Sequence, residues 1–334
     1  MSDLRGDLDS ATSDAGFTVR APASSANLGP GFDCFAMALA LDNEVQVCAG
    51  SGRLTVAGEG AETVALDASN LVARCFERAA PGELGNVDLH CVNRIPLARG
   101  LGSSTAAAAC GLIAGWEWTS ASWTADQLFR ELADIDGHDD NAAACAHGGI
   151  VATHRRARRQ AASGTNVVPH PTTSTSDADC PDAASDDDVV VLDFATPAWL
   201  TPVVIIPSRE LATAEARAVL PASYDRLAAI AQVANAVALT CALTRDDQSL
   251  LRRVLDTDQL HEPQRAALVP ELALVRDHLP DEALGATLSG AGPTVLAWAS
   301  PASIDDVIAA VTPHVGDARV VALTVEPTGA ALLA

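Results

Sequence analysis

The stretch that most constrains the fold of this chain is residues 94–111, whose centre, Gly-Leu-Gly-Ser-Ser at 100–104, runs directly into an alanine-rich segment. Two glycines let the backbone approach a ligand closely, and Ser103, Ser104 and Thr105 add hydroxyl donors. If a helix begins there, its first four N–H groups are unpaired and point outward at the positive end of the helix dipole. This combination is typical of a phosphate-binding turn.

The turn alone leaves a second interpretation open, because small-residue turns before helices also occur where a chain is merely packed closely. Two well-known nucleotide motifs are excluded. The chain contains no lysine, which a Walker P-loop requires. The G-x-G-x-x-G spacing of a dinucleotide-binding turn is absent as well.

Length and charge limit the number of domains and the kinds of partner. A chain of 334 residues fits two domains, and 49% hydrophobic residues are enough to build their cores. The 43 acidic residues outnumber the 21 basic ones, which gives a formal charge of -22. Such a charge repels nucleic acids and anionic membranes, so we expect neither as a partner.

The types of charged residue in the chain indicate the kind of organism from which the protein comes. Asp outnumbers Glu by 30 to 13, and every basic residue is arginine. Concentrated salt screens the repulsion within so acidic a chain, so we expect a halophilic archaeon. A GC-rich genome would also replace lysine by arginine, and this alternative stays open.

The cysteines and the N-terminus point to the cytoplasm. The eight cysteines are scattered from Cys34 to Cys241 without a C-x-x-C pair, which argues against a zinc site or a disulfide framework. The first residues are acidic and polar, unlike a signal peptide. No uninterrupted run of roughly 18 apolar residues exists. We therefore expect a cytoplasmic protein.

Composition divides the chain into segments. Residues 1–15 are polar and rich in Asp, and are expected to be a disordered acidic tail. An N-terminal domain is expected at 16–200, interrupted by a low-complexity insertion at 155–188 with Arg, Pro, Ser, Thr and Asp runs. A C-terminal domain is expected at 201–334.

Hydrophobic periodicity predicts the elements of the first half. The order strand, glycine turn, helix at 87–118 is the context that an anion site needs. Expected strands lie at 17–22, 39–47, 54–56, 87–92, through Val151, and at 189–194, and expected helices at 70–80, 104–118 and 124–134.

The second half reads as an α+β sandwich in the order β-α-α-β-β-α-β. A second glycine-rich turn, Ser-Gly-Ala-Gly-Pro at 289–293, lies between two of its strands. Near-continuous apolar runs at 189–194 and 203–206 predict buried strands. Further strands are expected at 284–288, 294–298 and 320–325, and helices at 213–217, 224–243, 248–255 and 304–311.

Two polar segments are candidates for function. The loop at 23–33 combines two glycines and a proline with Asn27 and Asp33, although it could also be a plain connection in which Asp33 caps a helix. The run Asp-Gly-His-Asp-Asp-Asn at 136–141 gathers side chains able to bind a metal or a substrate.

Three stretches together are more specific than any one of them. Residues 22–33, 96–104 and 288–293 resemble the three motifs of the GHMP small-molecule kinases. The first motif, with residues 137–141, 213–221 and 261–265, is similar to the members of that family that phosphorylate homoserine. The resemblance runs from about residue 17 to the C-terminus and omits the insertion.

This resemblance implies a two-domain α+β GHMP kinase fold. Its N-terminal domain would be like the second domain of ribosomal protein S5, and its C-terminal domain would be ferredoxin-like. The implied activity is ATP-dependent phosphorylation of the side-chain hydroxyl of L-homoserine, with Mg²⁺, in a possible homodimer. A GHMP kinase for another small alcohol such as mevalonate, or a catalytically silent GHMP-fold binding protein, are the alternatives.

The resemblance also implies roles for individual residues. Those expected to bind ATP are Pro96, Leu97, Ala98, Arg99, Gly100, Leu101, Gly102, Ser103, Ser104, Thr105, Ala106 and Asn70. Those expected to contact homoserine are Asn27, Asp33, His138, Arg217 and Arg265.

Metal binding and catalysis involve a further set of residues. Ser104 and Asp136 are expected to ligate Mg²⁺; the family often has Glu near the second position, so Glu131 is the alternative ligand. Arg99 would help to neutralise charge at the phosphates. Asp140 could accept the hydroxyl proton and Asn141 could orient the hydroxyl, and whether a base is used is left open.

Overall fold

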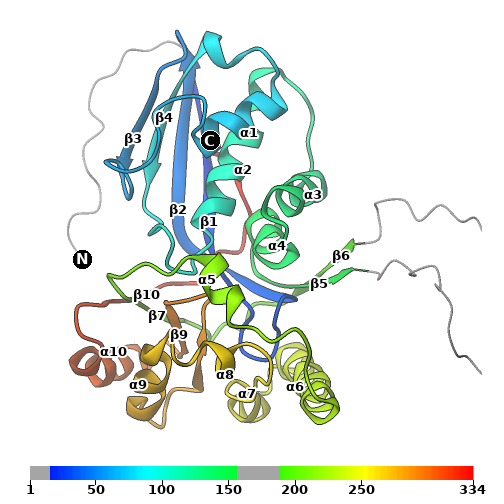
Figure 1. The fold of residues 1–334 in the computed structure, drawn as a ribbon, viewed down its shortest axis with the longest axis vertical. Helices are drawn as coiled ribbons and strands as arrows, with labels where there is room; N and C mark the ends of the chain where they lie inside the picture. Colours follow the sequence, from blue (N-terminus) through cyan, green and yellow to red (C-terminus); the bar gives the residue numbers. More distant parts are fainter. Residues whose placement is uncertain (1–15, 156–188, 334) are drawn as a thin grey trace, which may run out of the picture.

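Two β-sheets organise the part of the chain that this computed structural model describes, residues 16–155 and 189–333 (Figure 1). In these residues the larger sheet has seven strands in the order β11-β1-β2-β4-β3, with β5 beside β2 and β6 beside β5. The smaller sheet has four strands in the order β10-β7-β9-β8. The expected disordered tail at 1–15 and the expected insertion, apart from Arg155, lie outside the described residues.

The larger sheet is built around one long strand, β2. It pairs with β1 along most of its length, with β4 at residues 43–49 and with β5 at residues 35–37. Alternate residues such as Val45 and Val47 are buried in the core, as expected for strands with one covered face. The strands are β1 (Phe17–Ala26), β2 (Phe35–Ala49), β3 (Leu54–Gly58), β4 (Val87–Asn93), β5 (Ile150–Arg155), β6 (Val189–Phe194) and β11 (Ala331–Leu333).

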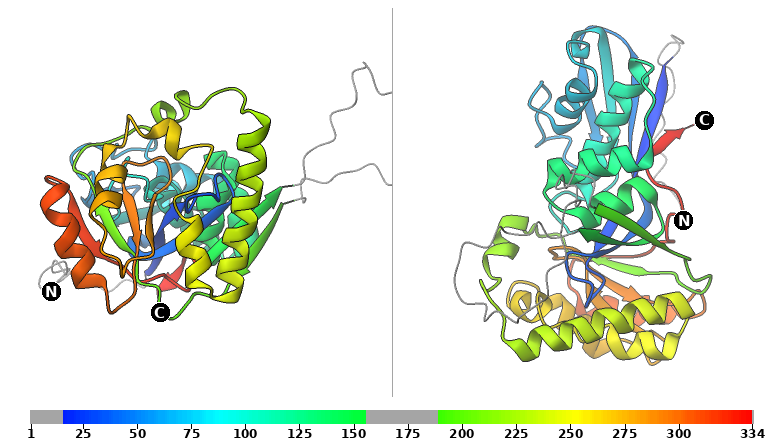
Figure 2. Two further views of the ribbon diagram at one scale, coloured as in Figure 1. Left: turned by 90° about the horizontal axis from the view of Figure 1, so that it is seen from below. Right: turned by 90° about the vertical axis from the view of Figure 1, so that its right-hand side faces the viewer.

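Helices α2 and α4 pack directly on one face of this sheet, and α1 and α3 pack against them (Figures 1 and 2). The helices are α1 (Leu71–Ala79), α2 (Ser103–Trp118), α3 (Ala125–Asp136) and α4 (Asp139–His147), with a short 3₁₀ turn, η1 (Leu84–Asn86). The small residues of α2 bring it close to α1, because a Cβ on Gly111 would overlap the carbonyl oxygen of Val72. Close packing therefore accounts for the later part of the alanine-rich stretch.

The second domain follows the β-α-β-β-α-β order of ferredoxin-like units, with extra helices in the first crossover. Strands β7 and β9 are fully buried between the helices and the first domain. The strands are β7 (Val203–Ile206), β8 (Gly285–Leu288), β9 (Val295–Trp298) and β10 (Arg319–Ala322). The helices are α5 (Thr213–Ala218), α6 (Arg226–Arg245), α7 (Gln248–Val254), α8 (Glu262–Arg265), α9 (Pro270–His278) and α10 (Ile304–Val311), followed by η2 (Thr312–His314). The two-domain α+β architecture predicted from the sequence is confirmed.

The structure differs from the predicted elements in several places, among them the short helix α8 and the strand β11, which were not predicted. Strand β6 is not buried as expected, because it pairs only with β5 in the described chain and leaves Val190 and Leu192 half-exposed. Helix α4 was not predicted, since its run of small residues has no helical periodicity. Helix α9 was not predicted either, although Pro270 at its first turn is a usual start signal.

The last strand lies in the expected C-terminal range but belongs to the first sheet. β11 pairs antiparallel with β1, with Thr18 opposite Leu333. The right-hand view of Figure 2 shows this strand, in red, at the edge of the first sheet beside β1. The described chain therefore crosses to the second domain and returns.

Helix α6 runs along the outer surface of the second domain (Figure 2). Of the helices in the described chain, it alone is long and apolar enough to cross a membrane, judged by length and composition. Less than a quarter of its apolar window is buried inside the protein.

Candidate active site

A cavity of about 420 Å³ lies where the two domains meet. The glycine turn and the start of α2 form one wall, and the 136–141 segment forms another. Asn27, Asp33, Arg217, Arg265 and Gly290 also line the cavity. The motifs that lie far apart in the sequence thus converge on one cavity.

The glycine turn has a backbone that only glycine adopts easily. Gly100 and Gly102 have φ values of 57° and 68°, in the left-handed region. A Cβ on Gly100 would overlap the carbonyl oxygen of Ser289, and a Cβ on Gly102 would overlap the hydroxyl of Ser24. Helix α2 begins directly afterwards, and Ser103 at its start lines the cavity. The turn therefore presents free helix N–H groups to the cavity, as an anion site requires.

Ser104 and Asp136 line the same part of the cavity. The Thr105 hydroxyl donates a hydrogen bond to Asp136, and burial raises the pKa of Asp136 above its ordinary value. Hydroxyl and carboxylate oxygens are ligands that Mg²⁺ accepts, so these residues fit the metal. Glu131, in contrast, forms an ion pair with Arg78 at 2.6 Å and does not line this cavity.

The protein offers few ligands to a metal at this place. No group of three or more His, Cys, Asp or Glu side chains suited to a metal occurs in residues 16–155 and 189–333. This is compatible with Mg²⁺, which often binds through one or two carboxylates together with substrate phosphates and water.

Asp140 and Asn141 lie in the first turn of α4 and face the cavity. The Asp140 side chain is 3% exposed and accepts a hydrogen bond from the Asn141 backbone N–H at 2.7 Å. Burial raises the pKa of Asp140 to about 7. The Ser24 hydroxyl donates to Asn141 Oδ1 at 2.8 Å and fixes its amide.

Asp33 and Arg217 form an ion pair across the cavity, with Nη2 2.9 Å from Oδ1. The same Arg217 nitrogen lies 3.2 Å from Nδ1 of His138, whose pKa is lowered by burial and then by the neighbouring Arg217. Asn27 holds the loop in place: its Oδ1 accepts the Asp33 N–H at 3.0 Å and its Nδ2 donates to the Gly290 carbonyl at 2.8 Å. The buried Arg217 Nε has no hydrogen-bond partner among the described residues.

Arg265 is a buried cation, 2% exposed, at the end of α8. Its Nε donates to the Ala216 carbonyl at 3.1 Å and its Nη1 to the Gly290 carbonyl at 3.2 Å. The guanidinium lies 5.5 Å from the ring centre of Phe32. Its Nη2 makes no hydrogen bond within the described chain, so Arg265 lines the cavity with an unused donor.

Known proteins share these domains and motifs. The family descriptions "GHMP kinases N terminal domain" and "GHMP kinases C terminal" match residues 69–149 and 238–317. The homoserine kinase of Streptomyces avermitilis is 37% identical over 301 residues, covering 88% of each chain. The chain belongs to the GHMP kinase family. The homoserine kinase of Deinococcus radiodurans is 38% identical over 84% of each chain.

Solved structures show the same fold for this GHMP kinase. The homoserine kinase from Cytophaga hutchinsonii superposes with a TM-score of 0.77 at 24% identity, covering 98% of this chain and 100% of that one. The L. major mevalonate kinase, solved with R-mevalonate, has a TM-score of 0.67 at 14% identity, with coverages of 95% and 97%. The predicted GHMP kinase fold is confirmed.

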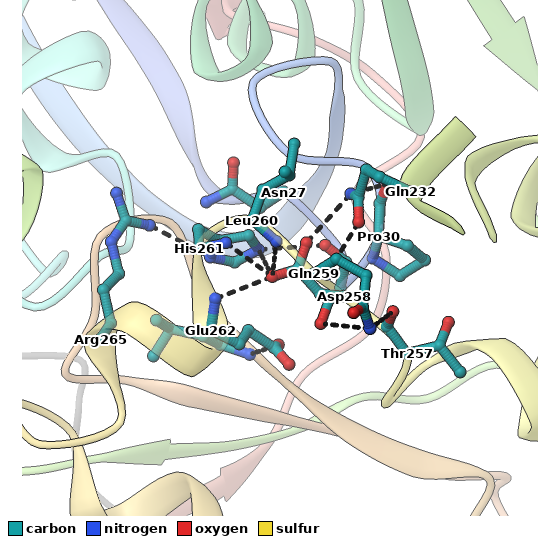
Figure 3. A network of polar contacts seen from close by, with 12 residues as sticks. Asn27, Pro30, Gln232, Thr257, Asp258, Gln259, Leu260, His261, Glu262 and Arg265 are labelled. Carbon is teal, nitrogen blue, oxygen red and sulfur yellow. Dashed lines mark hydrogen bonds and ion pairs between the residues drawn. The ribbon is translucent and has the colours of Figure 1, made fainter. Parts of the chain in front are cut away.

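One polar network of this GHMP kinase was missed by the sequence analysis (Figure 3). His261 Nε2 lies 3.0 Å from the Gly29 carbonyl, while its Nδ1 lies 3.2 Å from Arg265 Nη1. Arg265 is a donor only, so Nδ1 accepts and Nε2 carries the proton. Burial lowers the pKa of His261 to about 4, which keeps the ring neutral.

Asp258 anchors the same network. Its carboxylate accepts the backbone N–H groups of Leu260, His261 and Glu262, and Gln232 Nε2 at 3.0 Å. Gln232 also donates to the Pro30 carbonyl at 2.9 Å. The motif at 261–265 was noted in the sequence, but nothing near Gln232 or Asp258 signals that they join it to the 27–33 loop.

Some of the residues expected to bind ATP make contacts within the protein, and some do not line this cavity. Asn70 is the N-cap of α1: its Oδ1 accepts the Val72 N–H at 2.9 Å, and its Nδ2 donates to the Ala65 carbonyl. The Arg99 guanidinium donates to the carbonyls of Pro207 and Ser208, so it fastens the glycine turn to the second domain. Pro96, Leu97 and Ala106 do not line the cavity, whereas all the other expected residues of the turn do.

Proposed function

We propose that this GHMP kinase transfers the terminal phosphoryl group of ATP to the side-chain hydroxyl of L-homoserine, forming O-phospho-L-homoserine. One observation supports the substrate most directly: the Asp33–Arg217 pair lies in the cavity formed by the glycine turn. An amino acid carries a carboxylate and an ammonium, and this pair offers one partner for each. The relatives at 37% and 38% identity are named homoserine kinases.

The phosphates of ATP bind the backbone N–H groups of the glycine turn and the start of α2. These groups are fixed before the reaction, so they stabilise the developing negative charge without having to reorganise. Ser104 and Asp136 would hold Mg²⁺, which when bound supplies further neutralisation of the phosphate oxygens.

Homoserine binds by replacing one ion pair with two. Its carboxylate takes the place of Asp33 at Arg217 and also meets the free Nη2 of Arg265. Its ammonium binds the released Asp33. A guanidinium binds a carboxylate through two parallel hydrogen bonds, which orients the amino acid as well as holding it. His138 and Asn27 complete the pocket and leave the terminal hydroxyl directed at the phosphates.

Asp140 accepts the proton of that hydroxyl, and Asn141 orients it. With a pKa of about 7, Asp140 is partly ionised near neutral pH and able to take a proton. In-line positioning supplies most of the remaining rate, because phosphoryl transfer passes through a loose transition state.

A substrate panel tests the proposal. ADP release is measured with homoserine, threonine, mevalonate and galactose at equal concentrations, and homoserine is expected to have the highest kcat/KM. A higher value for mevalonate would assign the chain to the first alternative. ATP binding without turnover of any of the four would indicate a silent binding protein. Galactose is neutral and offers no carboxylate to Arg217 or Arg265, so we expect no turnover.

Cytoplasmic location, a homodimeric state and adaptation to high salt are also part of this proposal. None of the seven cysteines in the described residues forms a disulfide with another of them, which suits a reducing compartment. The acidic composition supports high salt, but the relatives named above are bacterial, so an archaeal source rests on composition alone.

A further inference from the structure

Two consecutive serines of β1 are completely buried but differ in their hydrogen bonds. Ser24 and Ser25 are both 0% exposed. Successive side chains of a strand point to opposite faces, so the two hydroxyl groups lie in different surroundings. The Ser24 hydroxyl donates to Asn141 Oδ1 at 2.8 Å, whereas the Ser25 hydroxyl has no partner among the described residues. Of the two serines, Ser24 is therefore the one tied to the active site.

Ser24 connects two walls of the cavity, although it does not line the cavity itself. Its backbone N–H donates to the Leu101 carbonyl at 3.1 Å, in the middle of the glycine turn, and its hydroxyl reaches Asn141 at the start of α4. The contact with the turn is close, because a Cβ on Gly102 would overlap the Ser24 hydroxyl. One residue thus fixes the phosphate-binding turn relative to the segment that carries Asp140 and Asn141.

The Ser24 hydroxyl also determines which way the Asn141 amide faces. Within the described chain, Asn141 Oδ1 is the acceptor of this buried hydroxyl, so reversing the amide would leave the hydroxyl proton without one. In the observed orientation Nδ2 is the free end of the amide. It makes no hydrogen bond in residues 16–155 and 189–333, and Asn141 lines the cavity. Asn141 therefore offers the cavity an N–H donor and not a carbonyl oxygen.

A donor at this place complements the carboxylate beside it. In the proposed function Asp140 accepts the proton of the substrate's hydroxyl, so a second group is needed to hold the hydroxyl oxygen. The Asn141 N–H can donate to that oxygen, which becomes more negative as its proton leaves. The two groups are also fixed to each other, since the Asp140 carboxylate accepts the Asn141 backbone N–H at 2.7 Å.

We propose that Ser24 is a positioning residue for phosphoryl transfer: it holds Asn141 so that Nδ2 donates to the attacking oxygen, at a fixed distance from the glycine turn. This inference rests on the proposed function, because it assumes that a hydroxyl attacks ATP in this cavity. The new O–P bond forms as the bond from phosphorus to ADP breaks, and the hydroxyl proton passes to Asp140. Ser24 contributes by keeping the attacking oxygen in line with the bond that breaks.

Stability of the strand does not account for the Ser24 hydroxyl. Strand β1 is paired with β2 through its backbone from Phe17 to Ala26, and these hydrogen bonds need no side chain. The neighbouring Ser25 shows that the same strand tolerates a buried hydroxyl without a partner. The bond from Ser24 to Asn141 therefore serves the residue that it orients.

Ser24→Ala, compared with Ser25→Ala, tests the inference. Each variant removes one buried hydroxyl from the same strand and keeps the backbone N–H. We expect kcat for homoserine to fall by about 10-fold or more in Ser24→Ala, with both KM values changed by less than about twofold. Ser25→Ala should keep the wild-type kcat and unfold at the same or a higher temperature, because it removes a buried polar group without a partner. A wild-type kcat in Ser24→Ala would overturn the proposal.

A double-mutant cycle separates the alignment of Asn141 from general damage. Asn141→Ala removes the amide, and we expect kcat to fall by about 10²-fold. If Ser24 acts through Asn141, adding Ser24→Ala to this variant should lower kcat by no more than about twofold further. A combined variant that shows the full loss of both single variants would mean that Ser24 supports the fold in general, and would overturn the positioning role.

Asn141→Asp tests the donor while keeping the shape of the side chain. A carboxylate still accepts the Ser24 hydroxyl but has no N–H for the attacking oxygen, so we expect kcat to fall as far as in Asn141→Ala. A wild-type kcat in Asn141→Asp would overturn the donor role. Wild-type protein that phosphorylates none of the four alcohols of the panel would overturn the proposed function together with this inference. Homoserine turnover that is equal in wild type and Ser24→Ala would remove the role of Ser24 alone.

Discussion

At the scale of single residues, Asp33 and Arg217 neutralise each other in the way that, in our proposal, the ammonium and carboxylate groups of the substrate would neutralise them. Their side chains are 43% and 34% exposed, so the ion pair contributes at most about 1 kcal/mol and opens easily. A zwitterion that enters between them restores a partner to each charge. Arg265, in contrast, is buried and held by carbonyl oxygens, so it cannot move to meet a ligand. The pocket thus combines one exchangeable and one fixed cation.

Replacing Arg217 and Arg265 tests whether the substrate is homoserine or one of the alternative alcohols. Arg265→Lys loses the fork that reaches Ala216 and Gly290 together, and Arg217→Ala loses the exchangeable cation. We expect kcat/KM for homoserine to fall by about 10²-fold in each, with KM for ATP little changed. Steady-state kinetics provide the measurement. Arg209→Lys, in a surface ion pair with Glu271, is the control. Unchanged homoserine kinetics in both variants would mean that the carboxylate binds elsewhere.

Removing the Ser104 hydroxyl should damage the chemical step. Ser104→Ala takes one oxygen ligand from the cavity at the mouth of α2. We expect kcat to fall by about 10²-fold or more at saturating Mg²⁺, equivalent to roughly 3 kcal/mol of transition-state stabilisation. A wild-type kcat in this variant would contradict the metal role.

Asp140→Asn should affect activity and stability in opposite directions. Burial raises the pKa of Asp140 to about 7 in the folded protein, above its unfolded value. The stability that the protonated carboxyl provides is therefore complete below the unfolded pKa and is lost as the pH rises through about 7. The amide does not ionise, so the variant should unfold at higher denaturant concentration than wild type at pH 8 and at the same concentration near pH 4.

Turnover of the same variant tests the base. We expect kcat to fall by about 10²-fold or more at pH 8, because the amide cannot accept a proton. Full activity together with the stability gain would leave the burial argument intact and remove Asp140 as the base.

At the scale of elements, the sequence identifies what local chemistry encodes. The glycine turn and the Thr124 cap of α3 are each readable from a few neighbouring residues, whereas Asn70 was expected to bind ATP and is the N-cap of α1. The exposure of β6 cannot be predicted in this way, because a run of apolar residues looks the same in a central strand and in an edge strand. The link from Gln232 to Pro30 depends on tertiary packing alone, and no spacing in the sequence predicts it.

Helix α8 contacts both domains at the pocket, and His261 connects it to the 27–33 loop. His261→Leu keeps the bulk but removes the hydrogen bonds to Gly29 and Arg265. We expect KM for homoserine to rise about 10-fold or more with KM for ATP unchanged, because the buried Arg265 and the loop lose their mutual alignment. His261→Gln can still donate to Gly29 and should recover part of the affinity. Equal losses for both substrates would indicate general disruption.

We predict that the insertion at 155–188 is dispensable, because β5 and β6, which flank it, pair with each other. Arg155 and Val189 are directly paired, so the ends of the intervening segment lie side by side. Deleting residues 157–186 and closing the gap with a short linker should leave homoserine turnover nearly intact, since loop length changes closure entropy only slowly. A collapsed circular dichroism spectrum in high salt would show that the segment packs against the protein.

At the scale of the whole molecule, the acidic charge and the cavity have separate tasks. The excess of acids keeps the surface soluble and repels anionic polymers. The cavity brings together three of the 21 arginines, Arg99, Arg217 and Arg265, beside the start of α2. The sequence alone reveals the overall charge and the motifs, but only the fold shows that these cations meet in one place.

Strand β11 determines when the sheet of the first domain can be completed during synthesis of the chain. The edge of β1 that receives β11 stays open until residues 331–333 have left the ribosome, after the entire second domain. A nascent first domain therefore carries an unpaired strand edge for most of translation, and such edges attract other unfinished chains. The first domain is thus translated first, but its sheet is completed last, when β11 pairs with β1.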